Sequence, residues 1–269
     1  MSARFQRKLE ARLRGEQEPT DDEVDAEFDA EIAEHTKTIE RDPKCADAFK
    51  ARGVAFYDKG DYDSAIADFT ELIRLAPSAW AFVSRALVYK DHKTKRDIGR
   101  ALEDFDKALE LDPHYAPAFW YRGILYSMTV EGHERALADL SEAVRVSSEK
   151  WNPLISRGDL YHVRARTIHE EAFDQRHHGG PSQADCDHRA APYFDLAIDD
   201  YTKVLNTKAP TATHATALTK RSMSKRLKGD VRGSESDHKL SHLLMETRFS
   251  WGSPKWIRAR LGLRRARKA

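Results

Sequence analysis

Histidine and cysteine side chains, which ligate zinc or copper in many proteins, gather in one stretch of the chain. They are His162, His169, His177, His178, Cys186 and His188. After His169 the sequence runs through two glutamates to Phe173, so the second histidine of a helical zinc-protease motif is missing. We therefore interpret the segment 177–181 as a mobile loop and predict no cofactor. The alternative is a metal site at His177, His178, Cys186 and His188.

Arginine and aspartate side chains recur together, which indicates ion pairs. The arginines are Arg52, Arg85, Arg122, Arg157 and Arg221, and the aspartates that follow them are Asp68, Asp104, Asp139, Asp200 and Asp237. The pairs could form within one unit or between successive units, and the pattern leaves both open. Losing one partner would cost ~3–5 kcal/mol if the pair is partly buried and ~0–1 kcal/mol if it is exposed. We predict a structural role for these arginines, with binding of an anionic ligand as the alternative.

Motifs of catalysis are not found in the sequence. It contains no glycine-rich phosphate loop, no serine-hydrolase elbow and no paired-cysteine zinc pattern. Helix surfaces, turns and the recurring pairs account for the many Asp and Glu residues. The sequence therefore predicts that the protein is not an enzyme.

The recurring pairs belong to a longer repeat. One copy has Phe49, Arg52-Gly53 and Phe56, a turn at Gly60-Asp61, then Ala65, Phe69 and Leu72, and ends at Pro77. The same order returns in units at about 46–77, 79–113, 116–148, 151–210 and 215–245. Apolar residues spaced three and four apart make a stripe on each of two helices, and a small residue such as Gly53 lets the helices approach. One helix pair cannot bury its stripe alone, so neighbouring pairs must stack into a solenoid.

These residues resemble the tetratricopeptide repeat family, whose units are helix-turn-helix pairs of roughly 34 residues. The resemblance covers approximately 23–245, and Val24, Phe28, Ile32 and Ile39 look like the second helix of a degenerate leading unit. It implies an all-α fold, a right-handed α-solenoid of tandem helix-turn-helix repeats, to which we add a C-terminal helix. It also implies a scaffold or adaptor that binds other proteins.

In this family the first helices line a concave groove, so the resemblance assigns partner contacts to first-helix residues outside the packing stripe. They are Asp47, Lys50, Val54, Tyr57, Trp80, Val83, Leu87, Lys90, Trp120, Ile124, Ser127, Asn152, Ile155, Asp159 and His162, followed by Thr216, Thr219, Met223 and Arg226. We expect a peptide or amphipathic helix of another protein to dock there, with Trp80 and Trp120 as anchors. The alternative is that a segment of this chain fills the groove. The terminal-carboxylate clamp of chaperone-binding members is not expected, because Val54 and Leu87 stand where polar contacts are needed.

An insertion, 163–190, interrupts the fourth unit. We expect its early part, Val163 to Phe173, to prolong the preceding helix. The next helix, which carries Tyr193 and Tyr201, is expected to start at Ala190.

The two ends of the chain differ in charge. Residues 1–22 are interpreted as an N-terminal helix and a flexible acidic segment, whereas 246–269 is a basic segment with no acid after Trp251. Ser253-Pro254 is a good helix start, and Trp256, Ile257 and Leu261 follow on one side. We expect this helix to cap the last unit. The alternatives are that the basic tail binds an anionic membrane surface or nucleic acid.

Composition favours a cytoplasmic location. No apolar run approaches the roughly 18–20 residues that cross a bilayer. The start of the chain lacks the continuous apolar core of a secretory signal. Cys45 and Cys186 match no disulfide framework, which fits a reducing compartment.

Overall fold

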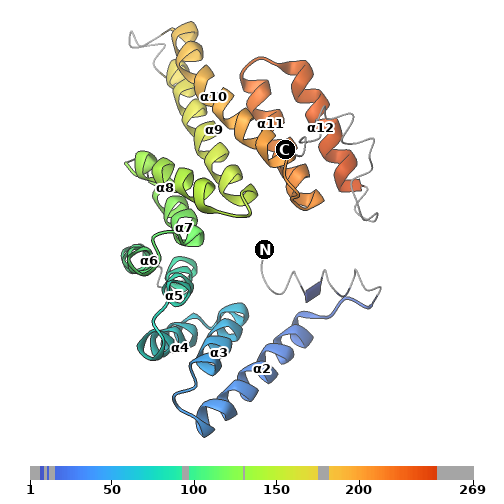
Figure 1. The fold of residues 1–269 in the computed structure, drawn as a ribbon. Helices are drawn as coiled ribbons and strands as arrows, with labels where there is room; N and C mark the ends of the chain where they lie inside the picture. The colour runs from blue at the N-terminus through green and yellow to red at the C-terminus, as the bar shows by residue number, and fades with distance from the viewer. Residues whose placement is uncertain are drawn as a thin grey trace, which may run out of the picture. The chain divides into compact units, whose positions relative to one another are not determined.

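The computed structural model describes residues 7, 8, 11, 16–92, 97–129, 131–174 and 182–246, in which helices alternate with short turns and loops (Figure 1). The helices are α2 (Asp21–Arg41), α3 (Ala46–Lys59), α4 (Tyr62–Leu75), α5 (Ala79–Asp91), α6 (Ile98–Leu111), α7 (Ala116–Ser127), α8 (His133–Val146), α9 (Trp151–Asp174), α10 (Gln183–Leu205), α11 (Thr211–Leu227) and α12 (Val231–Glu246). The chain divides into two compact units, unit 1 (Met1–Leu125) and unit 2 (Tyr126–Ala269). The division falls near the end of α7.

Capping side chains explain where several helices begin. The Thr20 hydroxyl accepts a hydrogen bond from the backbone of Glu23, and the Glu23 carboxylate accepts one from the backbone of Thr20. This reciprocal capping box starts α2. Asp61 and Ser78 cap α4 and α5 with their side-chain oxygens. Gly60 ends α3 in the left-handed conformation, at a φ of 92°, which favours glycine.

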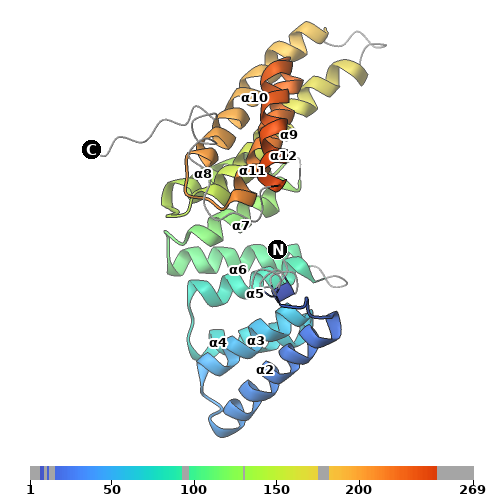
Figure 2. The same ribbon diagram turned by 90° about the vertical axis from the view of Figure 1, so that its right-hand side faces the viewer.

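Unit 1 is built from helix pairs. Helix α3 packs against α4, α5 packs against α6, and α2 covers α3 (Figure 2). The apolar stripes meet in cores that contain Phe49 and Phe69 in the first pair and Phe105 in the second. Gly53 lies where α3 and α4 cross, because a Cβ atom there would stand 2.9 Å from the Phe69 ring. The glycine therefore serves close helix packing, as the sequence predicted.

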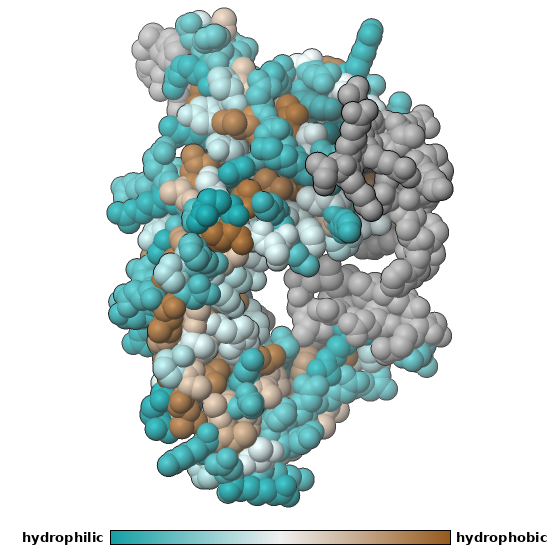
Figure 3. Space-filling model, in the orientation of Figure 1, coloured by the Kyte–Doolittle hydropathy of each residue, from teal (hydrophilic) through white to brown (hydrophobic). Residues whose placement is uncertain are grey.

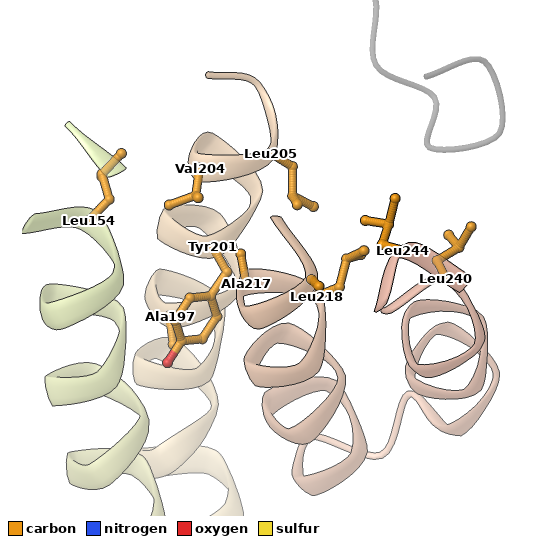
Figure 4. Close-up of a cluster of buried hydrophobic side chains, with 10 residues drawn as sticks. Leu154, Ala197, Tyr201, Val204, Leu205, Ala217, Leu218, Leu240 and Leu244 are labelled. Atoms are coloured by element: carbon orange, nitrogen blue, oxygen red, sulfur yellow. The ribbon is translucent and has the colours of Figure 1, made fainter. Parts of the chain in front are cut away.

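Unit 2 follows the same design with longer helices. Helix α9 packs against α10 and α11 against α12. Figure 4 shows their shared core, in which Tyr201 and Leu218 are fully buried. A Cβ atom on Gly158 would lie 2.7 Å from the Tyr201 ring, so this glycine repeats the role of Gly53.

The insertion lengthens α9 and α10 into an antiparallel hairpin (Figure 1). Helix α9 continues to Asp174, as predicted, but α10 begins at Gln183 and not at Ala190. The predicted start was wrong because Ser182 and Asp185 form a capping box that begins the helix earlier. A second small core, Ala165, Ile168, Ala190 and Phe194, fills the lengthened part of the hairpin. Residues 175–181 lie outside the described part.

Paired helices that stack through apolar stripes define an all-α solenoid of helix-turn-helix repeats. The described residues have this fold, which confirms the predicted class. The predicted C-terminal helix begins at Ser253 and lies outside the described residues.

Candidate partner-binding surface

An arginine on the first helix of a pair donates two hydrogen bonds to an aspartate on the second helix. Arg52 donates from Nε and Nη2 to the two carboxylate oxygens of Asp68, at 2.8 and 2.7 Å. The same two bonds, at 2.6 to 2.9 Å, join Arg85 to Asp104, Arg157 to Asp200 and Arg221 to Asp237. These four aspartates, like Asp139, are buried. In these pairs the arginine and aspartate belong to the same unit, which settles the choice that the sequence left open.

The remaining guanidinium nitrogen, Nη1, reaches the second helix of the preceding pair. Arg52 donates to the Thr36 hydroxyl at 3.1 Å, and Arg122 donates to Asp106 at 2.6 Å. The acceptors for Arg85, Arg157 and Arg221 are Thr70, Ser141 and Thr202. We call the arginine, its aspartate and this acceptor the arginine staple, because it joins two successive second helices through one first helix. Sequence reasoning missed the acceptor, although Thr70, Asp106, Ser141 and Thr202 each stand two residues after an aspartate of the series.

The staple explains what the arginines do. The hydrogen bond to the aspartate raises the pKa of Arg52, Arg85 and Arg157 above the ordinary arginine value. Such charge-assisted, bidentate pairs are geometrically specific. In Arg52, Arg85, Arg157 and Arg221 the nitrogens Nε, Nη1 and Nη2 all donate within the fold. This geometry favours the structural role over an anionic ligand.

The first helices of unit 1 leave a mixed apolar and cationic surface. Val54 on α3 is 37% exposed, and Lys50 one turn before it is also exposed. The Lys50 ammonium lies 4.4 Å from the centre of the Trp80 ring, a cation–π distance. Trp80 is partly buried because its ring packs edge-on against Phe69 at 6.0 Å. Leu87 on α5 is also partly buried and stands two helical turns after Trp80, on the same side of the helix. We call Lys50, Val54, Trp80 and Leu87 the unit-1 face.

Two predicted groove residues of unit 1 have structural roles instead. Val83 is 5% exposed and packs in the core with Phe105. Its predicted surface position was wrong because α5 contributes to the cores on both of its sides. The Tyr57 hydroxyl donates to Asp91 at 2.7 Å and so joins α3 to α5. Burial, together with this bond, raises the pKa of Tyr57.

The remaining predicted residues lie on α7 and α9. Trp120 and Ile124 are partly buried, and the Trp120 ring centre lies 4.5 Å from that of Tyr121. Ile155 packs against the core of unit 2. Asp159 accepts hydrogen bonds from the Tyr201 hydroxyl and from Lys220 on α11, all at 2.8 Å.

Comparison with known proteins agrees with this repeat geometry. Residues 28–79 match the model of the family described as tetratricopeptide repeat. Photosystem I assembly protein Ycf3 of Acaryochloris marina is 29% identical over 133 residues, which are 47% of this chain and 78% of that protein. The crystal structure of PilW, a type IV pilus biogenesis factor, has a TM-score of 0.56 at 16% identity and covers 92% of this chain and 93% of its own. Residues 28–79 therefore carry the tetratricopeptide repeat, and the helix pairs of the described chain have the fold of that family.

A further relative is similar to this chain over a part of its length only. Heat shock protein sti1 homolog of Schizosaccharomyces pombe is 32% identical over 96 residues, which are 35% of this chain and 15% of that protein. The similarity therefore covers a part of that relative and not its whole length.

The described residues among the candidate metal ligands do not form a metal site. Cys186 is buried in α10 and His188 is exposed on the same helix, while His177 and His178 lie outside the described residues. Within the described ranges, no three His, Cys, Asp or Glu side chains gather as a metal site. His169 instead contacts Asp187 across the hairpin at 2.8 Å.

The ends of the chain are described in part. Arg7 contacts Glu27 and Glu31 of α2 at 2.5 and 2.8 Å, whereas the basic segment 247–269 lies outside the described residues. None of the described helices is long and apolar enough to cross a membrane. On the face seen in Figure 3, apolar side chains form separate patches among polar ones.

Proposed function

We propose that this chain is a protein-interaction scaffold, and that a peptide or an amphipathic helix of another protein binds to its unit-1 face. The observation that supports the proposal is the set of side chains that the cores and staples leave at the surface. Val54 and Lys50 are exposed, and Trp80 presents part of an aromatic ring beside them. Aromatic residues that border apolar ones are typical of the residues that dominate protein interfaces.

The packing beneath this surface favours binding without rearrangement. Trp80 is fixed by Phe69 below and by Lys50 beside it, and Arg52 and Arg85 fasten α3 and α5 to their second helices. A surface that is ordered before binding loses less conformational entropy when a partner docks. Ycf3 is named as an assembly protein, and the scaffold role proposed here is of the same kind.

Substitution Val54→Glu tests the proposal. The side chain is exposed, so we expect the helix content and thermal midpoint to stay close to those of the natural protein. A carboxylate on the unit-1 face would have to be desolvated by an apolar ligand, and we expect affinity for the partner to fall by about tenfold or more. The measurement is affinity purification of partners, followed by titration calorimetry with the protein that is captured.

Leu111→Glu is the matched control, because Leu111 is 52% exposed at the end of a second helix, away from the unit-1 face. We expect the control to retain the partner. Equal retention by both variants would show that the unit-1 face does not bind it. Trp80→Ala is less clean, since it also removes the contact with Phe69. Trp120→Ala extends the test to α7, where we also expect loss of the partner.

The proposal includes a cytoplasmic location and no catalytic step. Both cysteines, Cys45 and Cys186, are free thiols, as a reducing compartment requires.

A further inference from the structure

Unit 2 exposes apolar side chains on its own first helices. Val163 on α9 is 39% exposed, and Met223 and Leu227 on α11 are 55% and 39% exposed. Met223 and Leu227 stand four residues apart and therefore lie on the same face of α11. We call these three residues the unit-2 patch.

Polar bridges between α9 and α11 place the patch residues close together. Lys220 donates to both carboxylate oxygens of Asp159 at 2.8 Å, and His162 Nδ1 lies 2.8 Å from the Ser224 hydroxyl. The bridged residue numbers rise together, so the two helices run in the same direction. Val163 stands one turn beyond Asp159, and Met223 about one turn beyond Lys220. In this register Val163 on α9 lies level with the stretch of α11 between Met223 and Leu227.

The patch has a cationic border. Helix α11 contains no Asp or Glu, and with the residue that follows it carries five Lys or Arg side chains; the residues are Lys220, Arg221, Lys225, Arg226 and Lys228. Asp237 holds Arg221 and Lys225, and Asp195 holds Lys228. Arg226, three residues after Met223, makes no ion pair with any residue that the structure describes.

A second arginine lies on α9, the helix that carries Val163. Arg166, three residues after Val163 on α9, pairs only with Glu170 in the described part of the chain. The two side chains are 3.4 Å apart and both are more than half exposed, so the pair is weak and easily exchanged. Arg166 and Arg226 therefore leave donors available on both helices that carry the patch.

We propose that the unit-2 patch binds an acidic amphipathic helix of another protein, with apolar side chains against Val163, Met223 and Leu227 and carboxylates toward Arg166 and Arg226. The inference rests on the proposed scaffold function and adds a second surface with a stated charge preference. Helices that dock in this way present anchors at spacings of three and four residues. The chain's own basic segment, 251–269, is disfavoured as the occupant because it would bring like charges to these arginines.

A displayed peptide library tests this preference and does not require the natural partner. Each member is an 18-residue helix with leucines at helical spacing and flanking positions that vary among Glu, Lys and Ser. Selection on the full-length protein should enrich Glu over Lys at the flanks by about tenfold, the effect of two exposed ion pairs together. The affinity of the selected peptides is then measured by fluorescence anisotropy.

Variants of the patch decide whether the enrichment comes from this surface. Met223→Gln with Leu227→Gln should weaken the selected peptides by about tenfold or more, and Leu111→Gln, an equally exposed control on α6, should not. Arg226→Glu should shift the selected flanks from Glu toward Lys. Failure to enrich Glu, or unchanged affinity in the double variant, would overturn the inference. Binding of the protein to phosphatidylserine vesicles that is lost in the double variant, with no peptide enriched, would assign the patch to a membrane and equally overturn it.

The two proposals fail in different experiments. Val54→Glu should leave the selected peptides bound, because Val54 lies in unit 1. If Val54→Glu retains the natural partner while the peptides still require Met223 and Leu227, the unit-1 proposal falls and this inference stands. If the peptides bind independently of Met223 and Leu227 while Val54→Glu loses the partner, only this inference falls.

Discussion

Substitution Asp200→Asn measures how strongly an arginine staple holds a helix pair. The Asp200 side chain is 2% exposed and the Arg157 side chain 15% exposed, so both charges lie out of water. Asparagine keeps the size of the side chain but removes the charge that balances the guanidinium. Removing one partner of a buried pair costs about 3–5 kcal/mol, because the other charge stays buried and uncompensated. Since a domain of this size is stable by only about 5–15 kcal/mol, the variant should be severely destabilised.

Urea unfolding followed by far-UV circular dichroism gives the free energy of unfolding. Glu71→Gln is the control, because it breaks an exposed pair with Arg74 in which the side chains are 43% and 62% exposed. This control should cost about 0–1 kcal/mol. The double variant Arg157→Met, Asp200→Leu should recover much of the loss, since apolar residues can replace a buried pair. Equal and small effects of Asp200→Asn and Glu71→Gln would refute the view that the staple is a buried, structural pair.

Three other perturbations test the same reasoning in unit 2. Thr202→Val removes the acceptor for Arg221 Nη1 and should lower the free energy of unfolding by about 1–2 kcal/mol in the same urea assay. Gly158→Ala places a Cβ atom 2.7 Å from the Tyr201 ring and should cost about 1–3 kcal/mol, whereas an unchanged urea midpoint would show that the helices can separate freely. Burial lowers the pKa of the His162 imidazole in the folded protein below the ordinary value of 6.5. The neutral, buried imidazole therefore contributes to the free energy of unfolding above pH 6.5, and this contribution is lost as the pH falls through the lowered pKa. Urea midpoints measured from pH 8 to 5 should therefore fall less steeply in His162→Gln than in the natural protein.

The helix pairs could be predicted from sequence because their signals are local. The spacing of Phe49 and Gly53, and of Ala65 and Phe69, marks the stripe and the crossing point within one unit. The start of α10 was missed because only Cys186 and Ala190 are buried in its first two turns, too few to show a period. The available signal was Ser182 followed three residues later by Asp185, which is a capping pattern and needs no apolar residue.

The arginine staples and the surface of the first helices were less predictable because they depend on contacts between successive helix pairs. The arginines and aspartates were visible as a series, but whether Arg52 pairs with Asp68 of its own unit depends on how successive pairs stack. Val83 was misplaced for the same reason: a helix in the middle of a stack is covered on two sides, which a single helical period does not reveal. The bridge from Lys220 to Asp159 joins residues that are 61 positions apart, so no local sequence pattern predicts it.

Stability and the proposed recognition depend on different positions of the same first helix. The small residue at the crossing and the arginine before it face the second helix, where their neighbours leave little freedom. The residue directly after the small one points about 100° away from the helix crossing, since successive helical residues turn by that angle. At this position the units carry different side chains, namely Val54, Leu87, Ile124, Asp159 and Met223. The repeat can therefore keep its staples and change its ligand, so exposed substitutions such as Val54→Glu and Met223→Gln should alter binding while the free energy of unfolding stays within about 0.5 kcal/mol.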